Sequence, residues 1–127
     1  MSKKLQQPSE AEIEILQELW DSAPMTVREV HEKLRLKKKV GYTTTLKQMQ
    51  RMLEKGFVKR EDGEKGHYYS ALIKEEETKG QIFDKMIDTL FKGSAMDMIM
   101  HALGRNDTNE EELKQLKEWL DNKEKDK

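Results

Sequence analysis

Two copies of the same helix-start signal lie close together near the N-terminus and restrict this part of the chain to short helices. The segments "SEAE" (Ser9–Glu12) and "TVRE" (Thr26–Glu29) each place a hydroxyl residue three positions before a glutamate. In this capping box the hydroxyl and the carboxylate satisfy two free backbone N–H groups. Between the two signals, "DSAP" interrupts the helical pattern. Apolar residues follow each start at helical spacing, namely Ile13, Leu16, Leu19 and Trp20 in the first helix and Val27, Val30 and Leu34 in the second.

A third amphipathic segment and a hairpin pattern come next. The segment Thr43–Lys55 has Thr43 as its predicted N-cap, and Gly56 follows its last turn, where a left-handed residue ends a helix without steric cost. Its apolar face consists of Leu46, Met49 and Leu53, with Met52 beside them. The stretches "FVKR", "EDGEKG" and "HYYSALI" then read as strand, turn and strand. This order predicts a mainly α fold that begins with a winged helix-turn-helix domain, residues 1–74, made of three helices and a β-hairpin wing.

Positive charge is concentrated in one part of the sequence. The formal net charge is only −1, yet residues 1–74 contain 15 Lys and Arg against 11 Asp and Glu, whereas residues 75–127 contain 9 against 14. From Arg35 to Arg60 there are nine basic residues and one acid, Glu54. A basic first part predicts contact with a polyanion, although solvated lysines on an exposed face would give a similar pattern.

The polar face of the third helix is suited to DNA. On a helical wheel, Thr43, Thr44, Lys47 and Arg51 form a strip away from the apolar face. A recognition helix enters the major groove with its N-terminal end, where short hydroxyls allow close approach. Lys47 can reach a guanine edge or a phosphate, and Arg51 is placed for the DNA backbone. Thr45 turns inward and is predicted to be structural. Further predicted DNA contacts are Lys38, Lys39, Tyr42, Lys65 and His67.

The composition changes after Leu72, where "KEEETKG" precedes three amphipathic segments. The second of these is expected to end at Gly104, and the third to be capped by Thr108 or Asn109. Hydrophobic residues make up 35% of the chain and charged residues 39%, so a thin helical protein that needs a partner surface to complete its core is expected. These segments are too short, and too apolar on one side, to be stable alone, so they either pack back on the first domain or pair with another copy. Residues 75–127 are therefore predicted to be a helical dimerisation domain, which pairs through Phe83, Ile87, Leu90, Met98, Leu113, Leu116 and Trp119.

The segments "SEAEIEILQELW", "TVREVHEKL", "YTTTLKQMQRMLEKGFVKR" and "HYYSAL", in this order, resemble the penicillinase-repressor (BlaI/MecI) family. The likeness covers almost the whole chain, and its most specific matches are Trp20, the Tyr-Thr-Thr at 42–44, Arg51 and Lys55-Gly56. The resemblance implies a dimer that represses transcription from a palindromic operator. It also implies control of β-lactam-resistance genes, with relief when a membrane-bound sensor protease signals and the repressor is cut in its dimerisation domain.

The sequence departs from this family pattern at two places. The cleavage point of the best-known members is an Asn-Phe pair in the middle C-terminal helix, and the matching candidate positions here are His101 and Ala102. His101 taken alone reads as a partly buried helix residue. Lys47 stands where the resemblance leads to a threonine, so a different operator is expected. The chain has no Cys, whereas the copper-responsive branch carries a cysteine cluster near its C-terminus.

Other functional classes match the sequence less well. "HEKL" lacks the second His of a zinc-protease motif, and His31, His67 and His101 lie on separate elements, so no catalysis, metal or cofactor is predicted. A winged helix used only to bind protein would expose apolar residues on its third helix. A further alternative keeps DNA binding but replaces cleavage with a small ligand or a partner protein. Because no apolar run reaches a membrane span and "MSKKLQQPSE" has no signal region, a cytoplasmic protein is predicted.

Overall fold

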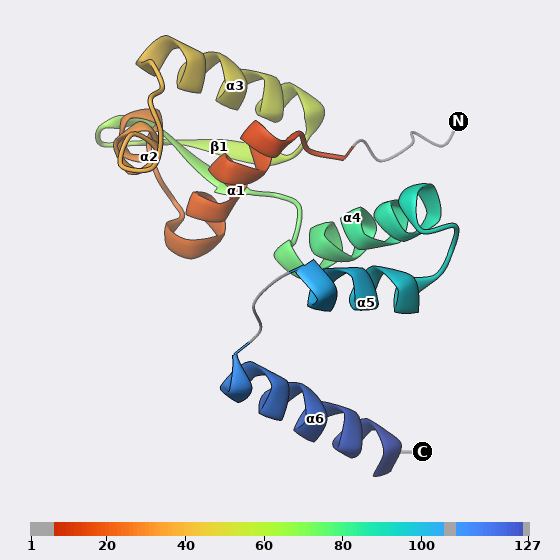
Figure 1. Cartoon of the computed structure of the whole chain (residues 1–127). Helices are drawn as coiled ribbons and strands as arrows, with labels where there is room; N and C mark the ends of the chain where they lie inside the picture. The colour runs from red at the N-terminus through yellow and green to blue at the C-terminus, as the bar shows by residue number, and fades with distance from the viewer. Residues whose placement is uncertain (1–6, 106–108, 126–127) are drawn as a thin grey trace. The chain divides into compact units, whose positions relative to one another are not determined.

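The computed structural model describes residues 7–105 and 109–125. These residues form helices and one two-stranded antiparallel sheet (Figure 1). The fold class predicted from the sequence, mainly α with one hairpin, is confirmed. The chain consists of two compact units, of which the first ends at Ile82 and the second begins at Phe83. The elements are α1 (Glu10–Ser22), α2 (Val27–Leu34), α3 (Tyr42–Lys55), β1 (Val58–Gly63), β2 (Gly66–Ala71), α4 (Glu75–Leu90), α5 (Ala95–Arg105) and α6 (Glu110–Lys125).

Both predicted capping boxes are present at the starts of α1 and α2. The Ser9 hydroxyl accepts a hydrogen bond from the Glu12 backbone N–H at 3.2 Å, and the Glu12 carboxylate accepts one from the Ser9 N–H at 2.8 Å. Thr26 and Glu29 repeat the arrangement at 3.1 and 2.9 Å. The two helix starts are therefore fixed by local chemistry, before any tertiary contact is considered.

The start of α3 differs from the prediction. Its N-cap is Gly41, with an extended backbone at φ −84° and ψ 151°, and no side chain caps the helix. The prediction that Thr43 caps was wrong, because Thr43 already lies inside the first turn. Glycine is tolerated at an N-cap position, so the helix begins one residue earlier, at Tyr42. The other end is as predicted, since Gly56 adopts the left-handed conformation at φ 82°.

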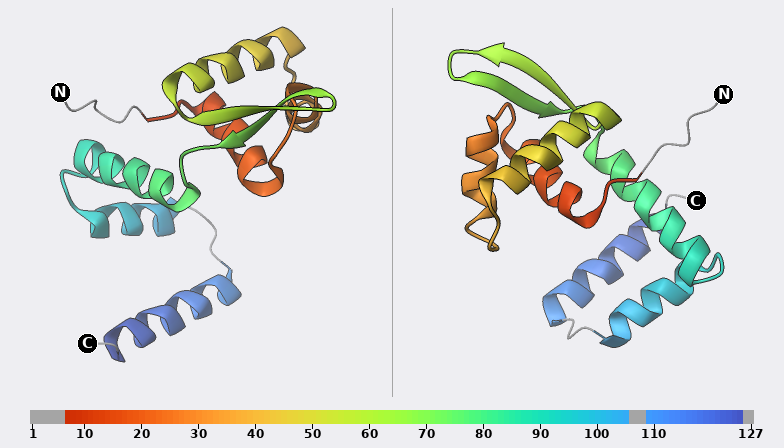
Figure 2. Two further views of the ribbon diagram at one scale, coloured as in Figure 1. Left: turned by 180° about the vertical axis from the view of Figure 1, so that it is seen from behind. Right: turned by 90° about the horizontal axis from the view of Figure 1, so that it is seen from above.

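The wing is a β-hairpin that extends from the three helices as an arm (Figure 2). Val58 pairs with Ala71 at its base, and Asp62 pairs with His67 near the turn. A further bridge, which the sequence analysis did not predict, joins Met25 to Tyr69. The two residues exchange backbone hydrogen bonds of 3.0 and 2.7 Å. This bridge attaches the α1–α2 connection to the hairpin and so holds the wing beside the helices.

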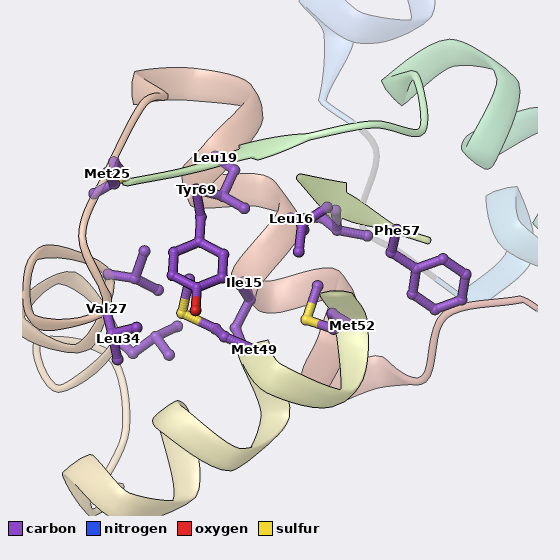
Figure 3. Packing of buried hydrophobic residues seen from close by; sticks show 12 residues of the cluster. Ile15, Leu16, Leu19, Met25, Val27, Leu34, Met49, Met52, Phe57 and Tyr69 are labelled. Carbon is purple, nitrogen blue, oxygen red and sulfur yellow. The ribbon is translucent and has the colours of Figure 1, made fainter. Parts of the chain in front are cut away.

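The core of the first unit lies between the three helices and the base of the hairpin (Figure 3). Met52, which was predicted only to flank the apolar face of α3, is fully buried, whereas Leu46 and Leu53 are partly exposed. The buried face of α1 includes Ile15, which was not predicted from the sequence to be part of it. Ile13, which was predicted, is only half-buried. The buried cluster comprises Ile15, Leu16, Leu19, Met25, Val27, Val30, Leu34, Met49, Met52, Phe57, Val58 and Tyr69.

One partly buried ion pair connects the start of α1 to the end of α3. The Lys55 ammonium lies 2.8 Å from the carboxylate of Glu12, whose side chain is only 6% exposed. Burial raises the pKa of Glu12, but hydrogen bonds from Lys55 and Ser9 outweigh burial, so the pKa is lowered overall. A lowered pKa means that the folded chain holds the ionised carboxylate more favourably than the unfolded chain does.

We expect Glu12→Gln to destabilise the protein by about 1–2 kcal/mol at pH 7, because the buried side chain at position 12 loses its charge-assisted hydrogen bond with Lys55. The contribution of Glu12 is complete above its ordinary pKa of 4.5 and disappears as the pH falls through the lowered value. Denaturant unfolding at pH 7 and pH 3, at one protein concentration, measures the difference. Glu10→Gln, on the exposed side of the same turn, is the control and should change stability by less than about 0.5 kcal/mol. Equal destabilisation by Glu12→Gln at both pH values would contradict this account.

The second unit contains helices that leave much of their apolar surface exposed. Neither α5 nor α6 has a buried side chain, and the side chains of Leu90 and Trp119 are 70% and 56% exposed. Helix α5 continues through Gly104 to Arg105, so the prediction that Gly104 ends it was wrong, since one glycine near the end of a helix is tolerated. Asn109 caps α6 by accepting the Glu112 N–H at 2.7 Å, while Thr108 lies outside the described residues. No helix in the described ranges is both long and apolar enough to cross a membrane.

Candidate nucleic-acid interface

A groove lies on the first unit where the start of α2, the helix α3 and the hairpin meet. It encloses about 550 Å³. The start of α2 contributes a helix N-terminus, whose partial positive charge favours anions. Elements far apart in the sequence thus supply one continuous surface. The groove is lined by Thr26, Val27, Arg28, Glu29, Tyr42, Leu46, Gln50, Arg60, Lys65, His67 and Tyr69.

The groove is predominantly basic. Arg28, Arg60 and Lys65 line it, and Glu29 is the one carboxylate among its described lining residues. The pKa of Glu29 is lowered, first by the hydrogen bond from the Thr26 backbone N–H and further by the charge of Lys65. His67 also lines the groove, but its Nδ1 lies 2.9 Å from Asp62, the residue opposite it in the hairpin. Three permanent cations against one ionised carboxylate leave the groove with net positive charge.

The predicted recognition strip lies on the exposed side of α3. Thr43, Thr44, Lys47 and Arg51 are all solvent-exposed, and the helix buries its opposite face through Thr45, Met49 and Met52. Because side chains repeat every 3.6 residues, burying that face turns Thr43 and Lys47 most directly outward. Figure 3 shows Met49 and Met52 pointing from α3 into the core. The strip therefore presents hydroxyl and cationic groups along one helix surface.

Thr45 has the structural position predicted for it. Its side chain is completely buried, and its hydroxyl lies 3.3 Å from Nδ1 of His31 on α2. The same hydroxyl donates to the backbone carbonyl of Gly41 at 3.5 Å. Thr45 thus connects the core of the domain to the N-cap residue of α3, whereas Thr43 and Thr44 face solvent.

Two of the three lysines before α3 take part in ion pairs with α1. Lys37 lies 2.9 Å from Glu18 and Lys38 lies 2.8 Å from Glu14. The hydrogen bond and charge of Glu18 raise the pKa of Lys37. Lys39 is exposed, and no ion pair to it occurs among the described residues. Part of the basic run therefore attaches a loop to the domain, so the count of basic residues overstates the free positive charge of this segment.

Three groove residues were missed by the sequence analysis, namely Arg28, Gln50 and Arg60. Arg28 lies in the first turn of α2, two positions after the capping Thr26. This position near a capped helix start was a usable signal, because helix N-termini attract anions and a nearby Arg reinforces them. Gln50 offered no comparable signal, and Arg60 was recognised only as part of the basic stretch, because only the packing of the hairpin beside α3 brings the two residues to one groove.

The family of the chain follows from its sequence match. The sequence profile described as "Penicillinase repressor" matches residues 8–122. The chain belongs to the penicillinase repressor family. The matched range includes the groove, the α3 strip and nearly all of the second unit, so the family resemblance drawn from the motifs is confirmed.

Individual members of the penicillinase repressor family are similar along most of the chain. "Methicillin resistance regulatory protein MecI" of Staphylococcus aureus (strain N315) is 23% identical over 123 residues, which cover 97% of this chain and 100% of that protein. "Transcriptional regulator BlaI" of Mycobacterium tuberculosis (strain ATCC 25618 / H37Rv) is 28% identical over 104 residues, or 80% of this chain and 75% of that protein.

A solved structure with a similar fold is the Bacillus licheniformis BlaI in its monomeric form, in complex with the blaP half-operator. It matches with a TM-score of 0.51 and 24% identity, over 60% of this chain and 93% of that chain. This similarity supports a winged-helix fold for this chain.

The candidate cleavage positions lie in the second unit, within α5. His101 and Ala102 are both exposed. The rings of His101 and Phe91 are in edge-to-face contact, with their centroids 6.0 Å apart. The prediction that His101 is partly buried was wrong, because α5 buries none of its side chains. A helical peptide bond does not fit a protease cleft that binds extended chain, so cleavage here requires local unwinding of α5.

We expect Thr45→Val to destabilise the protein by about 1–3 kcal/mol, because the near-isosteric change leaves the buried His31 nitrogen without a partner. The matched control is Thr44→Val, which makes the same change one residue earlier on the exposed surface and should alter stability by less than about 0.5 kcal/mol. Denaturant unfolding of both variants measures the two values. Equal effects of the two substitutions would show that Thr45 has no special structural role.

Proposed function

We propose that the chain is a transcriptional repressor that binds double-stranded operator DNA as a homodimer. The observation that carries this proposal is the exposed Thr43–Thr44–Lys47–Arg51 strip of α3 beside a basic groove bordered by the hairpin. Backbone phosphates match the cations of the groove, and base edges match the hydroxyls and the Lys47 ammonium on α3. The half-operator complex of the BlaI structure and the regulatory names of the relatives support the same function.

The proposed dimer forms through the second unit. Helices that bury no side chain of their own need a partner surface, and a second copy offers matching apolar faces. We assign DNA binding to residues 1–74 and dimerisation to residues 75–127, with the start of α4 packed in the first unit. The proposed interface residues are Phe83, Ile87, Leu90, Met98, Leu113, Leu116 and Trp119, which are exposed or half-buried in the single chain. Two linked α3 helices then fit two halves of a palindromic operator, and the second contact is effectively intramolecular.

The proposed regulated genes are of the β-lactam-resistance type. Relief of repression is proposed to follow cleavage within α5 at His101–Ala102 by a membrane-bound sensor protease, in the cytoplasm. Cleavage there would remove the dimer and with it the avidity for the operator. The alternative is relief by a small ligand or a partner protein. It is supported by the helical conformation of the candidate cleavage positions, which have to unwind before a protease can cut them.

We expect Lys47→Ala to change which bases are preferred, by about 1–3 kcal/mol at the affected position of each half-site. Arg51→Ala should weaken binding to all duplexes by a similar factor and reduce the salt dependence by about 0.9 in log–log slope for each phosphate that Arg51 neutralises. Selection of bound duplexes from a random pool, followed by titration of the selected duplexes at several salt concentrations, measures both effects. If Lys47→Ala, like Arg51→Ala, weakens binding to every duplex by the same factor, the assignment of different roles to the two residues is wrong.

We expect Leu113→Glu to raise the dissociation constant of the dimer by about 30-fold or more, because it places a charge in an apolar interface. Gln115→Glu adds the same charge at an exposed position of the same helix that is not among the proposed interface residues. This control should leave the dimer intact. Sedimentation equilibrium gives the dissociation constants, and an unchanged dimer in Leu113→Glu would exclude α6 from the interface.

A further inference from the structure

An arginine and a tyrosine are stacked where α2 and α3 meet the groove. The guanidinium carbon of Arg28 lies 5.1 Å from the centre of the Tyr42 ring. Arg28 belongs to the first turn of α2, and Tyr42 is the first residue of α3. Both side chains line the groove. A guanidinium over an aromatic face is attracted by the ring electrons and loses part of its rotational freedom.

The Tyr42 ring is itself held in place by the core. It meets the ring of His31 edge-on, with the centroids 5.5 Å apart and the planes at 88°. His31 is buried, and its Nδ1 contacts the hydroxyl of the buried Thr45 at 3.3 Å. Tyr42 is 38% exposed. The ring thus contacts a buried side chain, while the Arg28 guanidinium lies over its face.

The charges around Arg28 leave it available for an external anion. Glu29, the one carboxylate among the described residues of the groove lining, accepts the Thr26 backbone N–H at 2.9 Å in the capping box. No ion pair between Arg28 and a carboxylate occurs in the described part of the chain. Arg60 and Lys65 add positive charge to the same groove. A planar, pre-oriented guanidinium in a basic groove matches a phosphate group, which it can bind with two parallel hydrogen bonds.

We infer that Tyr42 is a positioning residue for DNA binding: its ring holds Arg28 in place to bind a backbone phosphate, and Tyr42 itself makes no contact with DNA. This inference rests on the proposed function and replaces the direct role predicted for Tyr42 from the sequence. It adds Arg28 to the DNA contacts.

The test is a double-mutant cycle on the full-length chain, with the best duplex recovered by selection as the probe. Arg28→Ala should weaken binding by about tenfold or more, since it removes a charge-assisted hydrogen bond. Tyr42→Leu should weaken binding several-fold in the wild type and produce no further weakening in the Arg28→Ala background. Tyr42→Phe keeps the ring and should bind like the wild type. Lys33→Ala, which removes an exposed cation of α2 outside the groove lining, is the control and should change affinity little.

Two outcomes of the cycle would overturn the inference. One is an equal weakening by Tyr42→Leu in both backgrounds. The other is a weakening by Tyr42→Phe as large as that by Tyr42→Leu, which would assign a DNA contact to the hydroxyl. If circular dichroism shows that Tyr42→Leu is unfolded, Arg28→Lys replaces it, because this change keeps the charge and removes the planar group. Arg28→Lys should then weaken binding several-fold, and wild-type affinity would overturn the inference.

The same experiment separates failure of the inference from failure of the proposed function. A wild-type chain that binds no duplex from the random pool refutes DNA binding altogether. A wild-type chain that binds a selected duplex, with Arg28 and Tyr42 acting independently, retains the proposed function and refutes only the positioning role. The salt dependence adds a third measurement, because Arg28→Ala should lower the log–log slope by about 0.9 for each phosphate that Arg28 neutralises.

Discussion

The burial of one face of α3 is the constraint on which the rest of the candidate interface depends. Thr45, Met49 and Met52 are completely buried, so the rotation of this helix about its axis is fixed. A helix that buries these positions has to turn Thr43 and Lys47 toward solvent. The ends of α3 are held as well, by the His31–Thr45 contact at the start and the Lys55–Glu12 ion pair at the end. The exposed strip is thus presented at a defined angle by residues that lie outside the strip itself.

Much of the first unit was predictable because its signals are local. Both capping boxes and the left-handed Gly56 depend on residues within one helical turn, and the structure has all three. The errors came from competition between near-equivalent local choices. Gly41 rather than Thr43 is the N-cap of α3, and Gly104 is accommodated inside α5. The bridge between Met25 and Tyr69 and the stacking of Arg28 on Tyr42 join residues far apart in sequence, and a helical wheel contains no information on such pairs.

The charge pattern of the sequence and the charge pattern of the surface are not the same. Lys37, Lys38 and Lys55 belong to the basic run, yet each is paired with a glutamate of α1. Conversely, Arg28 lies outside that run and lines the groove with Arg60 and Lys65. Positive charge in this fold therefore has two uses: some cations hold the helices together, and others remain facing solvent. The cations that hold the helices together differ from the others only in lying close to a glutamate of α1 in the folded chain.

The exposed apolar helices of the second unit have a consequence for how such a protein responds to its own abundance. In the proposed dimer, two chains must meet before a palindromic site is occupied with full strength. When most chains are single, the amount of dimer rises with the square of the chain concentration. Operator occupancy then changes more steeply than protein level does. Removal of a fraction of the intact chains, by any route, would lower occupancy more than proportionally, so in the proposed dimer the second unit would make repression more sensitive to copy number.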